Sequence, residues 1–195
     1  MSDEHRVSDE HRVGEDPIRT ERLELRPITA QLAESILTGA DPGSTGEPRP
    51  VEWAPGYPTD GDLVVCRIRV ADPPTDEDAL RFGLYQVVLR ADLRHDWAGH
   101  VVGGIGFFGP PVDGAVELGY GLAPLARGQG LAVEAATALV ALARSDRRVL
   151  AVHARTSPDN GASQGVLARL GMQPVGRDDS DPGEPLLCYR LDLHR

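Results

Sequence analysis

The chain contains no lysine: its 20 basic residues are all arginine, and 30 acidic residues give a formal net charge of −10. A P-loop needs a lysine directly after its last glycine, so the missing lysine excludes that class of phosphate site. Binding to nucleic acid is driven by basic side chains that displace counterions, so the acidic balance argues against a nucleic-acid partner. An acidic surface attracts cations such as an amine substrate, although it also serves solubility.

Cysteine, paired histidine and long apolar runs are also scarce. Cys66 and Cys188 show no metal or redox spacing, and we expect both to be ordinary core thiols. The six histidines form no His-x-x-x-His pair, so we expect no metal site. Because no apolar run approaches the length of a membrane span and the N-terminus is too charged for a secretory signal, we expect a cytoplasmic protein without membrane contact.

The first domain boundary is marked by a repeat. Residues 2–7 recur as residues 8–13, and two copies of a mostly charged hexamer have nothing to pack against. We therefore expect residues 1–16 to be a disordered tail and residues 17–195 to form one domain, which the length of 195 residues allows.

The hydrophobic pattern predicts an α/β fold with a mixed, mostly antiparallel sheet. Thr29 is a plausible N-cap for a helix over 30–37, and Gly39 a plausible stop. Residues 62–70 are ambiguous, because their apolar side chains favour a strand while the lead-in from Thr59 to Asp62 suits a helix cap. The segment 40–60 carries five prolines and should be a long loop. Further helices are expected over 132–144 and 160–170, and strands over 22–28, 84–90, 101–108, 115–122, 148–154, 172–176 and 186–193.

A glycine turn lies between the strand that ends at Leu122 and the Ala-rich helix that follows. The turn reads Arg127-Gly128-Gln129-Gly130-Leu131-Ala132. A helix that begins after glycines presents unpaired backbone N–H groups and the positive end of its dipole, so it can hold a phosphate or pyrophosphate. A dinucleotide fingerprint would place the third small residue one position later, which leaves an NAD-dependent oxidoreductase as a weaker alternative.

The run from Glu117 to Ala143 resembles the acetyl-CoA-binding core of the GNAT superfamily of N-acetyltransferases. That family has Arg/Gln-x-x-Gly-x-Gly/Ala, and Arg127, Gly130 and Ala132 fill the pattern. Segments on either side are similar to the branch that acetylates the N-termini of ribosomal proteins: Ile18–Pro27, Thr156–Ser163 and Leu167–Met172. One departure is Met172, where the family usually has Phe.

The resemblance covers residues 18 to 194 and implies a GNAT fold. It implies a sheet of about six to seven strands flanked by helices and splayed between the fourth and fifth strands, and it favours a helix over 62–70. It also implies acetyl-CoA as co-substrate, a primary amine as acceptor and direct attack in a ternary complex of a monomer or homodimer. A different class of protein stays open, a non-catalytic module of this fold that binds CoA or a protein partner.

Cofactor contacts follow from the same resemblance. We expect Arg127 either to contact the CoA phosphates or to be solvated, with backbone N–H groups of the turn as the main ligands. Gly130→Val should then abolish CoA binding and leave the fold mostly intact. The cofactor-binding set is Leu122, Arg127, Gly128, Gln129, Gly130, Leu131, Ala132 and Asn160.

Catalysis requires that the ammonium of the acceptor lose a proton before attack. Glu117 is the candidate base, and its alternative role is a solvent-facing strand residue. A backbone N–H near Gly121 or Leu122, where the resemblance implies a bulged strand, would hold the oxyanion.

The family's usual tyrosine acid is replaced here by Leu167. Ser163 stands where the related branch has its donor to sulfur, and it could equally cap a helix beside Asn160. Tyr120 is a possible substitute. The acceptor itself stays open, and the aromatic residues Trp53, Tyr57 and Trp97 of the expected acceptor loops (53–57, 93–97 and 178–184) are predicted to anchor loops rather than to touch substrate.

Overall fold

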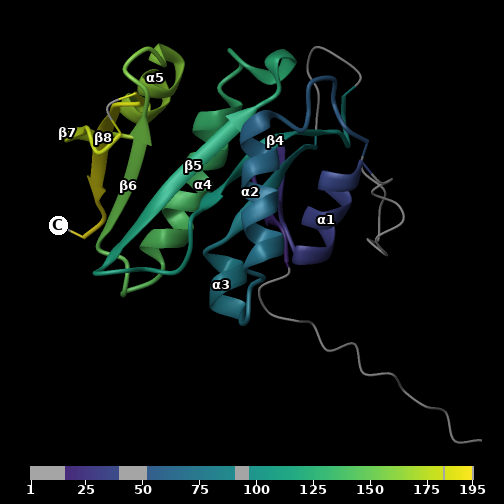
Figure 1. Ribbon diagram of the computed structural model, residues 1–195, viewed down its shortest axis with the longest axis horizontal. Helices are drawn as coiled ribbons and strands as arrows, with labels where there is room; N and C mark the ends of the chain where they lie inside the picture. The colour runs from purple at the N-terminus through teal and green to yellow at the C-terminus, as the bar shows by residue number, and fades with distance from the viewer. Residues whose placement is uncertain (1–15, 40–51, 91–96, 182, 195) are drawn as a thin grey trace, which may run out of the picture.

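The computed structural model describes residues 16–39, 52–90, 97–181 and 183–194. Their strands form one eight-stranded sheet in the order β1-β2-β3-β4-β5-β6-β8-β7, antiparallel except between β5 and β6 (Figure 1). The strands are β1 Ile18–Arg19, β2 Leu23–Pro27, β3 Leu84–Leu89, β4 Val101–Phe107, β5 Ala115–Leu122, β6 Ala151–Thr156, β7 Gln173–Asp178 and β8 Leu186–Asp192. The helices are α1 Ala30–Thr38, α2 Asp60–Ala71, α3 Glu77–Arg81, α4 Leu131–Arg144 and α5 Gly161–Arg169, with a 3-10 turn at Pro124–Ala126.

The predicted α/β fold with a mixed, mostly antiparallel sheet is confirmed. Thr29 caps α1, and Gly39 ends it with a left-handed φ of 65°. The ambiguous segment is helical, because Thr59 and Asp62 form a reciprocal capping box at the start of α2. The eighth strand, beyond the six to seven expected, is the two-residue β1.

Two elements differ from the prediction. Strand β6 begins three residues later than expected, because the side chain and carbonyl of Asp146 bind the backbone N–H groups of Arg148 and Val149 and hold them in a turn. The short helix α3 was not predicted; the side chain of Asp76 accepts a hydrogen bond from the backbone of Ala79 and caps it.

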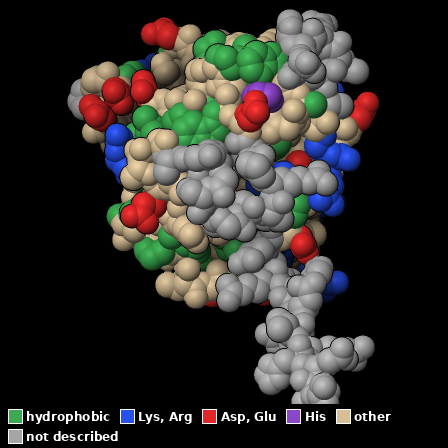
Figure 2. Space-filling model, turned by 90° about the vertical axis from the view of Figure 1, so that its right-hand side faces the viewer, with side chains coloured by type: hydrophobic (Ala, Val, Ile, Leu, Met, Phe, Trp, Pro, Cys, Tyr) green, Lys and Arg blue, Asp and Glu red, His purple; other side chains and the backbone are tan. Residues whose placement is uncertain are grey.

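Helices cover both faces of the sheet. Helix α4 lies behind the sheet in Figure 1, and α1 and α2 lie in front of it. Small residues on α4, with Ala135, Ala136 and Ala143 fully buried, allow close approach to the strands. On the face turned toward the viewer in Figure 2, hydrophobic side chains form separate areas between acidic and basic ones.

The sheet opens between β5 and β6. Only Ala115–Glu117 of β5 pair with Ala151–His153 of β6, and beyond them the strands diverge (Figure 1). This confirms the predicted splay between the fourth and fifth expected strands. The predicted bulge is wrong: β5 pairs regularly with β4 from Leu118 to Leu122. Glycine at 119 serves packing instead, since a Cβ there would lie 2.7 Å from Cζ of Phe108.

Several expectations fall outside the described residues, among them the predicted tail except for Asp16, most of the proline-rich loop and most of the 93–97 segment. Cys66 is buried and Cys188 is half-buried, and neither is in a disulfide. In the described ranges no helix has the length and apolar character needed to cross a bilayer.

Candidate active site

The glycine turn adopts the conformation that its composition allows. Gly128 and Gly130 have left-handed φ values of 73° and 77°, which cost glycine little and other residues about 1–2 kcal/mol. Gly130 is the N-cap of α4, and no side chain caps this helix. The first-turn N–H groups of α4 are therefore left to a ligand. The φ of 77° adds a stability cost to the expected Gly130→Val variant, and a mostly intact fold in that variant stays a prediction.

A cavity of 710 Å³ lies in front of this turn and runs into the opening beside β5. It brings together nine of the eleven predicted site residues: Tyr120, Leu122, Arg127, Gly128, Gly130, Leu131, Ala132, Asn160 and Ser163. Gln129 and Glu117 do not line it. The cavity also includes Arg169, which the sequence reasoning missed, although Arg169 follows the lining residues Ala162 and Val166 at helical spacing. The guanidinium adds a positive charge to a wall already favourable to anions.

The turn is held from behind by the N-terminal strand region. Arg22 Nε donates to Oε2 of Glu134, in the first turn of α4, at 2.6 Å, and its Nη1 donates to the carbonyl of Gln129 at 2.9 Å. Glu134 also accepts from the Thr20 hydroxyl and from the Arg22 backbone N–H. Burial opposes ionisation of Glu134, but these hydrogen bonds outweigh it and lower its pKa. Gln129 therefore contributes to holding the turn through its backbone.

Arg127 makes an internal contact that neither sequence interpretation included. Its Nε donates to the carbonyl of Leu122 at 2.9 Å. The residue itself is exposed and lines the cavity. Arg127 thus connects the end of β5 to the glycine turn, and its charge lies beside the space that a phosphate would occupy.

Tyr120 and Ser163 meet across the opening between β5 and α5. The hydroxyl of Tyr120 lies 2.9 Å from Oγ of Ser163 and 3.2 Å from its carbonyl oxygen. Asn160 caps α5 by accepting from the backbone N–H of Ser163, so the serine hydroxyl is not the cap. Burial raises the pKa of Tyr120, partly offset by the hydrogen bond with Ser163, so the phenol stays protonated at neutral pH. Leu167 is a core residue, 1% exposed.

Glu117 lies in an ion pair. Its carboxylate accepts from Nε and Nη2 of Arg155 at 2.8 and 3.2 Å, and Arg155 also reaches Asp178 at 3.0 Å. By strand alternation Glu117 shares the face of β5 that carries Gly119 and Gly121. Its role as a base stays a prediction.

The loop aromatics serve as anchors, as predicted. Trp53 and Tyr57 pack edge to face at 5.7 Å between ring centroids, and Trp97 packs against the main core. Tyr57 is buried, and its hydroxyl accepts from Gln86.

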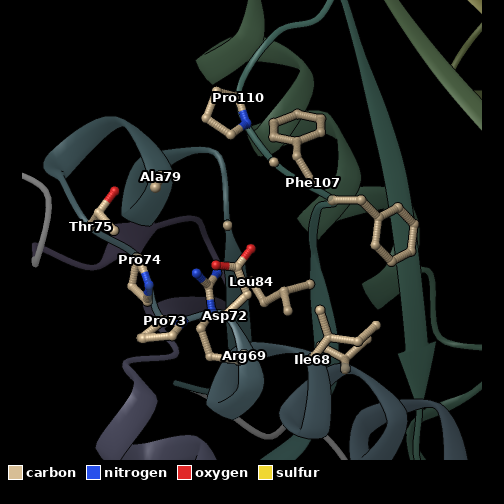
Figure 3. Close-up of a pocket in the computed structure, with 14 residues that line it drawn as sticks. Ile68, Arg69, Asp72, Pro73, Pro74, Thr75, Ala79, Leu84, Phe107 and Pro110 are labelled. Carbon is tan, nitrogen blue, oxygen red and sulfur yellow. The ribbon is translucent and has the colours of Figure 1, made fainter.

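Two smaller pockets are lined in part by α2. A pocket of 100 Å³ shares Tyr120 and Gly121 with the cavity and contains Asp62. A pocket of 180 Å³ shares Val65, Leu84 and Phe108 with the first and contains Arg69 (Figure 3). Sequence reasoning treated Asp62 only as part of a helix cap and did not consider Arg69. Among the residues that the structure describes, no group of three His, Cys, Asp or Glu side chains could hold a metal ion.

Comparison with known proteins finds a family model across most of the chain. The acetyltransferase (GNAT) domain matches residues 22–173. A 72-residue stretch, 36% of this chain, is 40% identical to the Bacillus subtilis (strain 168) protein described as uncharacterized N-acetyltransferase YjdG, and it spans 43% of that relative's length.

Solved structures share the fold. An acetyltransferase from Agrobacterium tumefaciens strain C58 is 28% identical with a TM-score of 0.55, over 92% of this chain and 94% of that one. The ribosomal L7/L12 α-N-protein acetyltransferase RimL, solved with coenzyme A, has a TM-score of 0.62 at 17% identity, over 91% and 98% of the two chains.

Proposed function

The chain belongs to the GNAT acetyltransferase family, and from this premise we propose that it transfers the acetyl group of acetyl-CoA to a primary amine by direct attack in a ternary complex. The observation that carries the proposal is the convergence of the uncapped α4 N-terminus and the Tyr120–Ser163 pair on one cavity. One end of that cavity suits a pyrophosphate and the other suits a reacting thioester.

The residues present fit coenzyme A. Gly128, Gly130 and Ala132 leave the backbone N–H groups of the turn accessible, and Arg169 adds charge for phosphate oxygens. Farther along the cavity, the side-chain amide of Asn160 and the part of β5 that is not paired with β6 offer partners for the amides of the pantetheine arm. When bound, acetyl-CoA supplies an activated carbonyl and a thiol leaving group.

The chain's own groups would then serve the transfer. A backbone N–H near Gly121 or Leu122 is proposed to hold the negative charge that develops on the carbonyl oxygen. Tyr120 is proposed to give its proton to the departing sulfur, and its hydrogen bond with Ser163 supports this role. Glu117 is a candidate proton acceptor on the sequence argument, and its carboxylate is paired with Arg155.

The proposed acceptor is an amine of one of two kinds. RimL, whose fold this chain shares, is described as acting on a ribosomal protein amine, so an N-terminal amine is one candidate and a small-molecule amine is the other.

Calorimetry with acetyl-CoA, CoA and NAD tests the cofactor. We expect acetyl-CoA and CoA to bind and NAD not to bind. Thiol release from acetyl-CoA in the presence of amines then tests transfer. Tight binding of acetyl-CoA without thiol release for any amine would support the non-catalytic alternative, and absence of acetyl-CoA binding would overturn the proposal.

A further inference from the structure

The buried side of α2 carries charged residues where apolar ones are expected. The three buried residues of this helix are Asp62, Cys66 and Arg69, which recur at helical spacing. Asp62 and Arg69 are each only 8% exposed. The apolar side chains of Val64, Ile68 and Val70 are instead exposed. Charged groups are rarely buried unless they are paired. The placement of charged residues on the buried side of α2 and apolar ones on its exposed side therefore needs an explanation beyond stability.

Asp62 has one carboxylate oxygen free for a ligand. Oδ2 accepts from the backbone N–H and hydroxyl of Thr59 at 2.8 and 2.6 Å, while no described residue binds Oδ1. Oδ1 lies over Gly104, where any Cβ would collide with it. Burial raises the pKa of Asp62, and the hydrogen bonds from Thr59 only partly offset this effect. None of the described residues that line the pocket is basic, so a cationic ligand would supply the missing partner.

Arg69 lines the second pocket and, like Asp62, has a polar atom without a hydrogen-bond partner among the described residues. Within the described part of the chain its buried Nε has no hydrogen-bond partner, and no ion pair involves the guanidinium. Asp72 attracts it electrostatically from the exposed rim, and burial lowers the pKa of Arg69. Gly83 provides the space for the guanidinium, since a Cβ there would collide with Nη2. Figure 3 shows Arg69 and Asp72 rising from the end of α2 beside Pro73 and Pro74.

The three cavities are neighbours, because they share lining residues, and the two small pockets beside α2 are together called the groove. The Asp62 pocket adjoins the large cavity through Tyr120 and Gly121, and it adjoins the Arg69 pocket through Val65, Leu84 and Phe108. The junction of the two small pockets is thus apolar. Asp62 and Arg69 are seven residues apart on α2, which is about 10 Å along the helix axis.

We propose that this groove binds the acceptor and that the acceptor is a primary amine carrying an anionic group, a carboxylate or phosphate, about 10 Å from its nitrogen. Asp62 binds the ammonium, Arg69 binds the anion, and an apolar spacer lies against Val65, Leu84 and Phe108. The proposal rests on the proposed function, because it places the nitrogen beside the cavity assigned to acetyl-CoA.

In this arrangement Asp62, rather than Glu117, takes the first proton. The ammonium gives one proton to the carboxylate of Asp62, and the freed nitrogen lone pair forms the C–N bond with the acetyl carbonyl carbon. The C–S bond breaks with its electron pair on sulfur. The second amine proton reaches the sulfur, directly or by way of Tyr120, and Asp62 later returns its proton to water. The products are an amide and a free thiol.

Binding tests the groove without any need for catalysis. The full-length chain is titrated with 4-aminobutanoate, 6-aminohexanoate, 8-aminooctanoate and 6-aminohexylphosphonate, with hexylamine and octylamine as matched ligands that lack the anion. We expect the longer amino carboxylates or the phosphonate to bind at least tenfold more tightly than the plain amines. The better of the two anions identifies the group. Equal affinity with and without the anion, or no binding at millimolar concentration, would overturn the proposal.

Variants locate the two charges. Arg69→Met should remove the preference for the anionic ligands, so that they bind no more tightly than the plain amines of matched length, whereas Asp62→Asn should weaken every amine. Arg67→Met, at an exposed position on the same helix, is the matched control and should behave as wild type. Unfolding curves verify that each variant is folded, and the wild-type comparison stands even if Arg69→Met is not.

The outcome can be separated from that of the proposed function. Acetyl-CoA titration and thiol release with octylamine report on acetyl transfer alone. Transfer to octylamine with no preference for an anion would overturn the groove assignment and leave the function standing. If the chain prefers anionic ligands in an Arg69-dependent way but does not bind acetyl-CoA, the groove assignment stands and the proposed function is overturned.

Discussion

Arg22 and Glu134 are 112 residues apart in the sequence, and Nε of the arginine lies 2.6 Å from Oε2 of the glutamate. Because Arg22 also binds the carbonyl of Gln129, this pair fixes the glycine turn against the N-terminal strand region. A residue outside the predicted site thereby supports the end of the cavity that we propose to hold the pyrophosphate.

Arg22→Met should weaken acetyl-CoA binding about tenfold, since the turn loses its support, and should lower the free energy of unfolding by about 1–3 kcal/mol. Calorimetry and urea unfolding measure the two effects. Arg19→Met is the control, because the Arg19–Glu24 pair is exposed on the arginine side and such pairs contribute little. Wild-type affinity in a folded Arg22→Met protein would contradict the role.

The same pair predicts a pH dependence of stability. The pKa of Glu134 is lowered in the folded chain, so its ionised form stabilises the fold above the ordinary value of 4.5, and this contribution is lost as the pH falls through the lowered value. Wild type should be more stable than Glu134→Gln at neutral pH, and the difference should shrink in acid. A difference that stays constant into acid would show that the charge is not the source.

Gly130→Ala separates backbone strain from ligand contact. Gly130 and Gly39 both adopt left-handed φ, and both end or begin a helix, so alanine at either position should cost about 1–2 kcal/mol of stability. Only Gly130→Ala should also lose acetyl-CoA affinity, by tenfold or more, because only Gly130 lines the cavity. Equal affinities of the two variants would remove Gly130 from the site.

Tyr120→Phe should lower kcat about 10²-fold, in the range that general acid catalysis contributes, with little change in acetyl-CoA affinity. Ser163→Ala should have a smaller effect. Since the two hydroxyls share a hydrogen bond, the double variant should lose less than the product of the single losses. Independent, multiplying losses would show that the hydroxyls do not act as a pair.

Asp62→Asn should raise the free energy of unfolding at neutral pH while lowering amine binding. The pKa of Asp62 is raised in the folded chain, so the folded state keeps the proton longer and wild-type stability falls as the pH rises through the raised value. The neutral amide avoids this loss and still accepts a hydrogen bond from Thr59. Unfolding curves at acidic and neutral pH should therefore show a gain only at the higher pH.

The sequence was sufficient for elements with strong local signals. Helix α1 begins after Thr29 and ends at Gly39, as expected. The glycine turn that the sequence predicted lines the cavity with Gly128 and Gly130. It could not reveal contacts between distant segments. Tyr120 and Ser163 were proposed separately, and 43 residues separate them in the chain.

Asp62 and Arg69 were not predicted as site residues for a different reason. A charged residue in a helix is usually assigned to solvent, and α2 reverses that rule. The helical spacing of Asp62, Cys66 and Arg69 was visible in the sequence, but only the folded structure shows that this side of α2 is the buried one. The late start of β6 was equally hidden, because it depends on the side chain of Asp146.

Only three residue pairs join β5 to β6. The sheet therefore has an N-terminal part, β1 to β5, and a C-terminal part, β6 to β8, with a weak seam between them. Few backbone hydrogen bonds cross this seam, so the two parts can exchange amide protons at different rates. A ligand that contacts both α4 and α5 spans the seam. Its binding should therefore make unfolding more cooperative, with protection from hydrogen exchange rising most in the C-terminal part.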